Sequence, residues 1–327
     1  MVLSFYNEEA VIPELVGRLR KVLRSPEVSN WLRGYELVFV NDASTDRSRQ
    51  LLMELAQGYE DIRVINMSRN FGVSTCVLAG MEMAKGDLIV YMDADLQDPP
   101  EVIPQMLAAK SAGQGFDVVH TVRLSRAGEP RIKLLVTRLG YFILKYVSTV
   151  DLQIEAGDFK LLSRRAVDQL IQLREKRPFL RGLVCWIGFP QTTIHYHREA
   201  RGSGRTKFNV FSLQVIRNFF ASALISFSDV PLQISSVLGV VVSLGALIYG
   251  GIVLMMKLKG VQPPPWSGLT VALMFLSGVQ LLTLGLQALY ISAIHAECKR
   301  RPNYIVESTF GFHNPPNGAN PRESGKA

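Results

Sequence analysis

The sequence has few cysteines for its 327 residues. Cys76, Cys185 and Cys298 lie far apart, none belongs to a Cys-x-x-Cys pair, and their number is odd. This pattern argues against a complete disulfide framework and against a structural zinc site. The opening residues also lack the basic and long apolar segments of a secretory leader. We therefore expect the globular part of the protein to stay in the reducing cytoplasm.

Charge is missing from two long stretches near the C-terminus. Residues 230–256 contain no charged side chain, and residues 260–296 contain only Tyr290 and His295 as ionisable candidates. Each stretch exceeds the roughly 20 apolar residues that cross a bilayer core. We expect a two-helix transmembrane hairpin over residues 229–297. A hairpin buried inside a globular core is the alternative.

Basic residues flank these two stretches and predict their orientation. Arg201, Arg205, Lys207 and Arg217 precede the first, and Lys299, Arg300 and Arg301 follow the second, whereas the short loop carries only Lys257 and Lys259. Basic residues favour the cytoplasmic side of a membrane. We expect an integral protein of the inner (plasma) membrane whose catalytic domain and termini are cytoplasmic.

Residues 208–228 place apolar and aromatic side chains at helical spacing, with polar residues between them. Such a pattern is typical of amphipathic helices that lie in the membrane interface. An ordinary helix packed on the globular domain would show the same spacing. The nearby apolar stretches favour the interfacial interpretation.

The net charge of +8 indicates an anionic partner, which could be nucleic acid, a phosphorylated substrate or an acidic lipid. The globular half lacks a basic stripe with interleaved aromatic residues. That stripe is expected of a nucleic-acid-binding protein. We therefore expect no nucleic-acid partner.

Short apolar runs alternate with amphipathic segments through the first half of the chain. The expected strands are Val2–Ser4, Tyr35–Val40, Ile62–Asn66, Leu88–Met92 and Asp117–Val122. The expected helices are Ala10–Leu23, Arg47–Gln57 and Gly72–Ala84. This alternation predicts an α/β fold with a mainly parallel sheet, in which ligands bind beyond the carboxyl ends of the strands.

The strongest local signal follows the strand at 88–92. Asp93 and Asp95 stand one residue apart, and Gln97 follows them in a polar turn. Mg²⁺ and Mn²⁺ prefer oxygen ligands and commonly keep substrate phosphates in their coordination shell. The motif thus predicts a divalent cation held against a diphosphate, although aspartate is also common in such turns as a helix cap.

A second acidic turn follows the strand at 35–40. It contains Asp42 and Asp46, and Asp46 can also be explained as a cap of the helix that begins at Arg47. Acidic turns at the ends of two parallel strands predict one shared ligand site at that edge of the sheet.

Six segments together make the sequence resemble the inverting family-2 glycosyltransferases of the Rossmann-like GT-A fold, also called the nucleotide-diphospho-sugar transferase fold. More narrowly, it resembles the polyprenyl-phosphate glycosyltransferases, which include bactoprenol glucosyltransferases and dolichol-phosphate mannose synthase. The resemblance covers nearly the whole chain through the second apolar stretch. The segments are Phe5–Glu9, Val40–Asp46, Ser68–Gly72, Asp93–Pro100, Gly157–Leu162 and Arg201–Lys207.

The resemblance implies a nucleotide-sugar donor site. Tyr6, Glu8 and Asp42 are expected to hold the nucleoside, and Arg201 and Lys207 to close on the diphosphate. A solvated charge run is the alternative for the last two. The turn at 41–44 departs from the family's Asp-Asp-Gly-Ser by its first and third residues.

The resemblance also assigns the catalytic centre. Asp93 is expected near the ribose and diphosphate, and Asp95 to bind Mg²⁺ or Mn²⁺ with Gln97 beside it. Asp158 matches a position near the reacting centre, where we expect it to orient phosphate or metal ligands.

Arg123, Lys133 and Thr137 match the positions that receive the phosphate of the acceptor. The acceptor would be a polyprenyl phosphate such as undecaprenyl phosphate. Its second pKa of about 6 leaves it largely dianionic at neutral pH, so a strong general base is unnecessary. In-line attack would invert an α-linked donor, with UDP-glucose the first choice and GDP-mannose or another UDP-sugar the alternatives.

Residues 1–207 are therefore the expected catalytic domain, and residues 298–327 a cytoplasmic tail. Similar two-span enzymes suggest a homo-oligomer, a tetramer. A processive polysaccharide synthase is disfavoured because Arg181–Trp186 does not match the Gln-x-x-Arg-Trp spacing. A non-catalytic component of sugar-lipid translocation is disfavoured because the apolar stretches lack acidic and basic residues.

Overall fold

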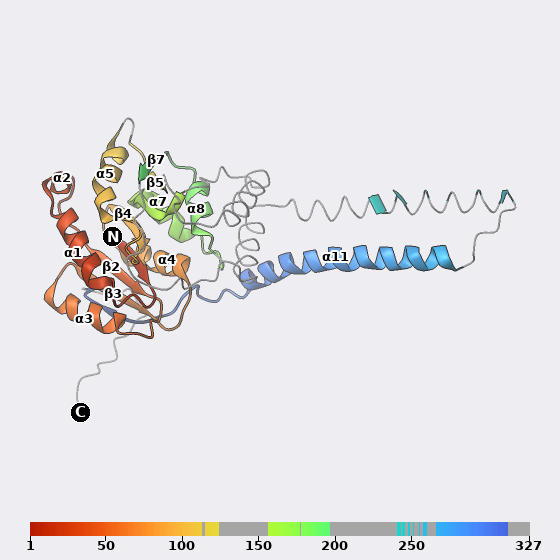
Figure 1. Cartoon of the computed structure of the whole chain (residues 1–327), viewed down its shortest axis with the longest axis horizontal. Helices are drawn as coiled ribbons and strands as arrows, with labels where there is room; N and C mark the ends of the chain where they lie inside the picture. Colours follow the sequence, from red (N-terminus) through yellow and green to blue (C-terminus); the bar gives the residue numbers. More distant parts are fainter. Residues whose placement is uncertain are drawn as a thin grey trace, which may run out of the picture. The chain divides into compact units, whose positions relative to one another are not determined.

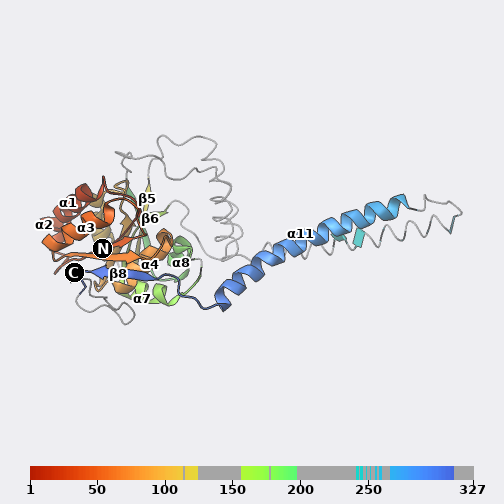
Figure 2. The same ribbon diagram turned by 90° about the horizontal axis from the view of Figure 1, so that it is seen from below.

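The computed structural model describes residues 1–112, 115–123, 156–176, 178–196 and 266–312, with isolated positions between 241 and 259. These residues belong to two compact units. One contains the sheet and its helices, including a strand that follows the last long helix; the other contains that helix. Figure 1 labels most of the elements, and Figure 2 adds β6 and β8.

The first unit is built on one sheet of eight described strands in the order β7-β5-β6-β4-β1-β2-β3-β8. The pairs β1–β2, β1–β4, β2–β3 and β5–β7 are parallel, whereas β3–β8, β4–β6 and β5–β6 are antiparallel. Only β6 and β8 thus run against the other six, so the expected mainly parallel sheet is a mixed one. The strands are β1 (Val2–Phe5), β2 (Leu37–Asn41), β3 (Ile62–Met67), β4 (Leu88–Asp93), β5 (Val118–Arg123), β6 (Ala156–Ser163), β7 (Gln191–Tyr196) and β8 (Val306–Phe310).

Helices cover both faces of this sheet. The contacts place α1, α2, α3 and α5 on one face and α4, α7 and α8 on the other; Figure 2 shows α1 and α3 across the sheet from α7. The bounds are α1 (Ile12–Leu23), α2 (Pro26–Ser29), α3 (Ser48–Gly58), α4 (Val73–Met83), the 3₁₀ helix η1 (Pro100–Val102), α5 (Ile103–Ser111), α7 (Arg164–Gln172) and α8 (Leu180–Trp186).

The central strands form because their residues are apolar on both faces. Every residue of β1 and β2 is buried, as expected for strands covered by helices on each side. Gly80 of α4 lies so close to the sheet that a Cβ atom there would stand 2.4 Å from Val2 Cγ1 and 2.9 Å from Val40 Cγ2. The absence of a side chain at Gly80 lets α4 pack directly on β1 and β2.

The expected strands and helices of the first 123 residues are present, with ends that differ by a few residues. Strands β6 and β7 were not expected. Strand β6 has the sequence Ala-Gly-Asp-Phe-Lys-Leu-Leu-Ser, in which two charged residues interrupt the apolar pattern. Asp158 is accommodated by an ion pair with Arg181 of α8, and the sequence around β6 gives no sign of this partner.

Strand β8 was also unexpected, because residues 298–327 were predicted to form a cytoplasmic tail. It pairs antiparallel with β3 at the edge of the sheet. Gly311 follows it at φ +80°, where a Cβ atom would stand 2.6 Å from the Ile62 carbonyl oxygen. Thus part of the expected tail completes the sheet of the first unit.

The second unit contains α11 (Ser267–Cys298), which is 32 residues long. Its segment Phe275–Cys298 is the one helix, among the described residues, that is long and apolar enough to cross a membrane. Large apolar side chains along it are exposed, including Leu281 at 70%. This helix coincides with the second predicted span, whereas most of the first span and the expected amphipathic helices at 208–228 lie outside the described residues.

Candidate active site

The predicted site residues that the structure describes lie at one edge of the sheet, where β1, β2, β4 and β5 end and β6 begins. Asn7, Ala43 and Leu96 follow the first three of these strands, and all three adopt left-handed backbone conformations, with φ of 56°, 58° and 55°. Gly72, after β3, has φ +91°. Non-glycine residues with positive φ are strained and cluster at functional sites.

The turns after β1 and β2 are tied together by hydrogen bonds. The Asn7 side chain accepts from the Thr45 backbone N–H at 2.7 Å, and the Asn7 N–H donates to Ser44 Oγ at 3.0 Å. The Glu8 N–H donates to Ser48 Oγ at 2.9 Å. This pairing places Tyr6, which is 38% exposed, and Glu8 beside the acidic turn after β2.

Asp42 is buried and organises the loop that leads into α4. Its Oδ1 accepts from the Phe71 N–H at 2.6 Å, and its Oδ2 accepts from the Gly72 N–H at 3.0 Å. Burial, and then the nearby Asp42 carboxylate, raise the pKa of the Cys76 thiol on α4. Asp42 thus connects the ends of β2 and β3, and its contact with a nucleoside stays a prediction.

Asn41, which departs from the family motif, has a structural role. Its Oδ1 accepts from the Ser44 N–H at 2.9 Å, and its Nδ2 donates to Asn66 Oδ1 at 3.0 Å. Asn66 in turn donates to Ser308 Oγ at 3.1 Å. A chain of side-chain amides therefore connects the turn after β2 with β3 and β8.

Asp93 and Asp95 lie half-buried at the end of β4. Asp93 Oδ1 accepts from Ser4 Oγ at 3.1 Å, and Asp95 Oδ1 accepts from the Gln97 N–H at 3.1 Å. Burial, and then the carboxylates of Asp158, Asp95 and Asp98, raise the pKa of Asp93 to about 7, against the opposing hydrogen bond from Ser4. Negative charge is thus concentrated at this turn.

Arg181 of α8 was not among the predicted site residues, yet it forms a two-pronged ion pair with Asp158. Its Nε lies 2.8 Å from Asp158 Oδ1, and its Nη2 lies 2.5 Å from Oδ2. Burial alone would raise the pKa of Asp158, but Arg181 outweighs it and holds that pKa below its usual value. No local pattern indicates this pair, because its partners are 23 residues apart on different elements.

Lys160 stands behind this ion pair in the sheet and is fully buried beside Tyr91 of β4. Burial lowers the pKa of Lys160 to about 8, although Asp158 opposes the shift. Within the described chain, the buried Tyr91 hydroxyl has no hydrogen-bond partner. Two polar groups, the Lys160 ammonium and the Tyr91 hydroxyl, are therefore buried on the face of the sheet that α8 covers.

Arg123 ends β5 and faces the opposite side of the sheet from the Asp158–Arg181 pair. Its Nε donates to Tyr196 Oη at 3.1 Å, and its Nη2 lies 3.4 Å from Asp98 Oδ2. The Tyr196 hydroxyl also donates to the other Asp98 oxygen. Neither Asp98 nor Tyr196 was predicted to belong to the site, although Asp98 lies in the quoted Asp93–Pro100 segment.

Four predicted residues, Lys133, Thr137, Arg201 and Lys207, lie outside the described part of the chain. Among the described residues, no group of three or more His, Cys, Asp or Glu side chains converges as a metal site. Mg²⁺ is commonly bound by one or two carboxylates together with substrate phosphates. The Asp93–Asp95 turn fits that kind of site, since its crowded carboxylates favour a cation and a diphosphate would complete the ligand shell.

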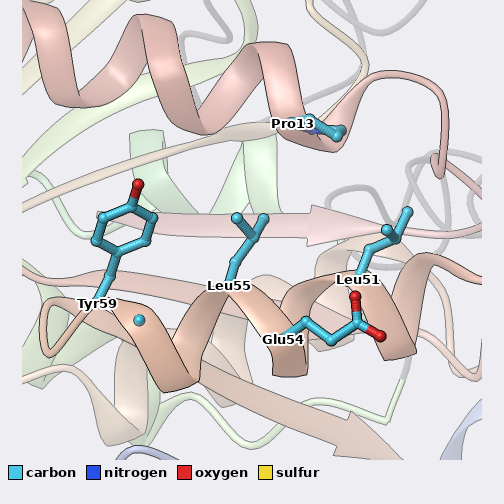
Figure 3. Close-up of a pocket in the computed structure, with 6 residues that line it drawn as sticks. Pro13, Leu51, Glu54, Leu55 and Tyr59 are labelled. Atoms are coloured by element: carbon cyan, nitrogen blue, oxygen red, sulfur yellow. The ribbon is translucent and has the colours of Figure 1, made fainter.

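A separate hollow of about 380 Å³ lies between α1 and α3 (Figure 3). Its lining is mainly apolar and contains none of the predicted site residues. The lining residues are Pro13, Leu51, Glu54, Leu55, Gly58 and Tyr59.

Comparison with known proteins identifies the family of the chain. The family model described as Glycosyl transferase family 2 matches residues 1–171. The chain belongs to this family.

Relatives extend the match over most of the chain. An uncharacterized glycosyltransferase, YkcC of Bacillus subtilis, is 39% identical over 96% of this chain and 94% of its own length. A prophage bactoprenol glucosyl transferase homolog of Escherichia coli is 33% identical over 94% of this chain and 97% of its own length. Among solved structures, a Pyrobaculum calidifontis mannosyltransferase aligns with a TM-score of 0.45 at 14% identity, covering 92% of this chain and 74% of its own.

Proposed function

We propose that this protein transfers a hexose, preferably glucose from UDP-glucose, to a polyprenyl phosphate at the cytoplasmic face of the membrane. One observation carries the proposal. The Asp93–Asp95 turn, suited to a departing diphosphate, and the Arg123 guanidinium, suited to an incoming phosphate, stand at the same edge of one sheet. The name of the bactoprenol glucosyl transferase homolog supports the same acceptor class.

On the donor side, Tyr6, Glu8 and Asp42 would hold the nucleoside at the ends of β1 and β2. The hydrogen bonds between the Asn7 and Ser44 turns would keep these groups in place before the substrate arrives. Such preorganisation reduces the conformational entropy that is lost when the substrate binds. Arg201 and Lys207 would close on the diphosphate.

Asp93, Asp95 and Gln97 would hold Mg²⁺ or Mn²⁺. The bound cation would neutralise the charge that develops on the departing diphosphate. Asp158, fixed by Arg181, would orient ligands on the other side of the reacting carbon. Its lowered pKa keeps it ionised at neutral pH, so it would serve as a fixed negative charge.

On the acceptor side, Arg123, together with Lys133 and Thr137, would receive the lipid phosphate. This phosphate carries close to two negative charges at neutral pH, so it can attack without a strong base. The required catalysis is positioning and charge compensation. Attack opposite the leaving diphosphate would give a β-linked sugar from an α-linked donor.

The membrane part would be a hairpin of two spans, with α11 as the second, and with both termini in the cytoplasm. The exposed apolar surface of α11 supports this arrangement, because large exposed apolar surfaces mark membrane or protein contacts. Cys298 is exposed at the end of α11 and provides a natural probe. A membrane-impermeant maleimide should label Cys298 in inverted vesicles, whereas Pro264→Cys in the loop should react in vesicles of the opposite orientation. The reverse labelling pattern would refute the topology.

The activity can be tested with the purified full chain in detergent, Mg²⁺, undecaprenyl phosphate and a panel of nucleotide-sugars. Mass spectrometry of the lipid should detect a hexosyl phospholipid with UDP-glucose. Product with GDP-mannose or another UDP-sugar alone would correct the donor but keep the reaction. No product from any donor, with binding of the nucleotide-sugar intact, would instead favour a non-catalytic role in sugar-lipid translocation.

The anomeric linkage requires its own measurement. The coupling constant of the anomeric proton in the purified lipid product should indicate a β linkage. An α linkage would show that the configuration is retained, and it would overturn the single in-line displacement.

A further inference from the structure

Three residues from separate parts of the chain surround the Arg123 side chain: two contact it and the third leaves room for it. Tyr196, the last residue of β7, accepts from its Nε at 3.1 Å, and Asp98, in the turn after β4, lies 3.4 Å from its Nη2. Gly157 of β6 supplies the space, because a Cβ atom there would stand 3.1 Å from Nη2 and 3.4 Å from Cζ. We call Asp98, Tyr196 and Gly157 the Arg123 clamp.

The Arg123 clamp is buried, while the arginine itself keeps some access to solvent. Asp98 and Tyr196 are 2% and 4% exposed, whereas the side chain of Arg123 is 23% exposed. Burial, and then the neighbouring Asp98 carboxylate, raise the pKa of Tyr196 to about 12, so its hydroxyl keeps its proton at neutral pH. The tyrosine can therefore donate to Asp98 and accept from Arg123 at the same time.

This arrangement occupies one edge of the guanidinium. Nε and Nη2 form the side-on edge, and both contact the Arg123 clamp. The end-on edge, formed by Nη1 and Nη2, has the fork geometry that binds two oxygens of a phosphate.

We propose that Tyr196 and Asp98 are positioning residues that lock Arg123 in the orientation needed to receive the phosphate of the lipid acceptor, with Gly157 providing the room. The inference rests on the proposed function and adds the residues that prepare its acceptor site. An arginine loses considerable side-chain freedom when it is fixed for binding. The Arg123 clamp fixes it before the acceptor arrives.

Tyr196→Phe tests the proposal most directly, because it removes only the hydroxyl and keeps the ring that packs edge-on against Phe159. We expect the KM for undecaprenyl phosphate to rise about tenfold, as the loss of one charged hydrogen bond of about 1.4 kcal/mol predicts. The KM for the nucleotide-sugar should stay within about twofold, and kcat should change less than the acceptor KM.

The chain contains a matched control. Arg24 donates through Nε to Tyr35 Oη at 3.0 Å, in the same kind of pair but on the exposed surface far along the chain from the site. Tyr35→Phe should leave both KM values unchanged. Gly157→Ala provides a second variant should Tyr196→Phe fail to fold; the added methyl group should displace the guanidinium and raise the acceptor KM as well.

Direct binding separates this inference from the proposed function. Calorimetry with farnesyl phosphate should show about tenfold weaker binding to Tyr196→Phe, and farnesol should bind both proteins equally. If the wild-type chain transfers sugar but Tyr196→Phe keeps its acceptor KM and its affinity for farnesyl phosphate, the clamp proposal is wrong and the proposed function stands. If the wild-type chain neither binds farnesyl phosphate nor modifies the lipid, both are wrong.

Discussion

The two halves of the sheet build the candidate site in different ways. The first half-sheet, β1 to β4, places its polar residues at the strand ends or directly after them, as with Asp42, Asp93 and Asp95. The second half-sheet, β5, β6 and β7, brings together residues that are distant in the sequence. Tyr196 contacts Arg123 across 73 residues and Asp98 across 98 residues.

This difference follows from strand direction. Parallel strands all end at the same edge, so strand direction alone brings the polar group of each turn of the first half-sheet there, and hydrogen bonds such as Ser4–Asp93 then hold it. Strand β6 runs the other way and brings Asp158 to this edge at its beginning. Asp158 needs a partner from α8, and Arg123 of β5 needs partners from β7 and from the turn after β4. These partners are fixed only when the sheet is assembled.

The largest effect is expected at the Asp93–Asp95 turn of the first half-sheet, the proposed site of the divalent cation. Asp95→Ala should reduce transfer by at least about 10²–10³-fold, because the charge on the departing diphosphate loses its compensation. Product lipid can be counted with a radiolabelled donor. Glu54→Gln, which removes a carboxylate from α3 away from this edge, should leave transfer unchanged. Near-normal transfer by Asp95→Ala would contradict the metal assignment.

The C-terminal strand β8 is expected to stabilise the first half-sheet, at whose edge it pairs with β3. Gly311→Ala should lower the free energy of unfolding by about 2–3 kcal/mol, because alanine is strained at φ +80° and its methyl group would press on the Ile62 carbonyl. Gly34→Ala, where a Cβ meets no atom within 4 Å, is the control. Equal melting temperatures for the two variants would mean that β8 contributes little.

The ion pair of the second half-sheet should matter more than a surface pair of similar geometry. Arg181→Ala should lower the free energy of unfolding by about 1–3 kcal/mol, since it leaves Asp158 half-buried near other carboxylates. Arg18→Ala leaves the Glu101 carboxylate, which is 51% exposed against 25% for Asp158, and also removes the 4.0 Å contact of Arg18 with Glu14. It should cost below about 1 kcal/mol. Denaturant unfolding measures the free energy of unfolding of both variants. Equal decreases in this free energy would show that the Asp158–Arg181 pair stabilises the fold no more than a surface pair does.

Asp93→Asn should stabilise the metal-free protein at high pH while it impairs transfer. The pKa of Asp93 is raised from its ordinary value of 3.8 to about 7, so its ionisation opposes folding above pH 7 and not below pH 4. The gain should be about 1–2 kcal/mol at pH 8, after allowance for partial exposure, and should vanish as the pH falls through that range. Melting curves in EDTA from pH 4 to 8.5 measure it. If the stability difference between Asp93→Asn and the wild type stayed constant from pH 4 to 8.5, the pKa of Asp93 would not be raised in the folded protein.

Several site features were predictable because they depend on local order. Asp42 and Asp93 stand at the ends of buried apolar runs that lead directly into polar turns. The structure confirms both runs as strands that end at the same edge of the sheet. The role of Asn41 was not predictable, because its amide partner on Asn66 belongs to another strand. Strand β8 could not be expected either, since it is short and follows a long apolar helix.

The sequence by itself determined the alternation of strands and helices in the first 123 residues, the acidic turns and the apolar character of α11. These features depend on periodicity and on neighbours within a few residues, so the local sequence contains the information without any tertiary contact. Only the tertiary structure decided that β6 runs antiparallel, that Arg181 pairs with Asp158, and that Tyr196 and Asp98 hold Arg123. The physical reason is that a buried charge is stable only beside its partner, and packing of distant strands decides which partner it meets.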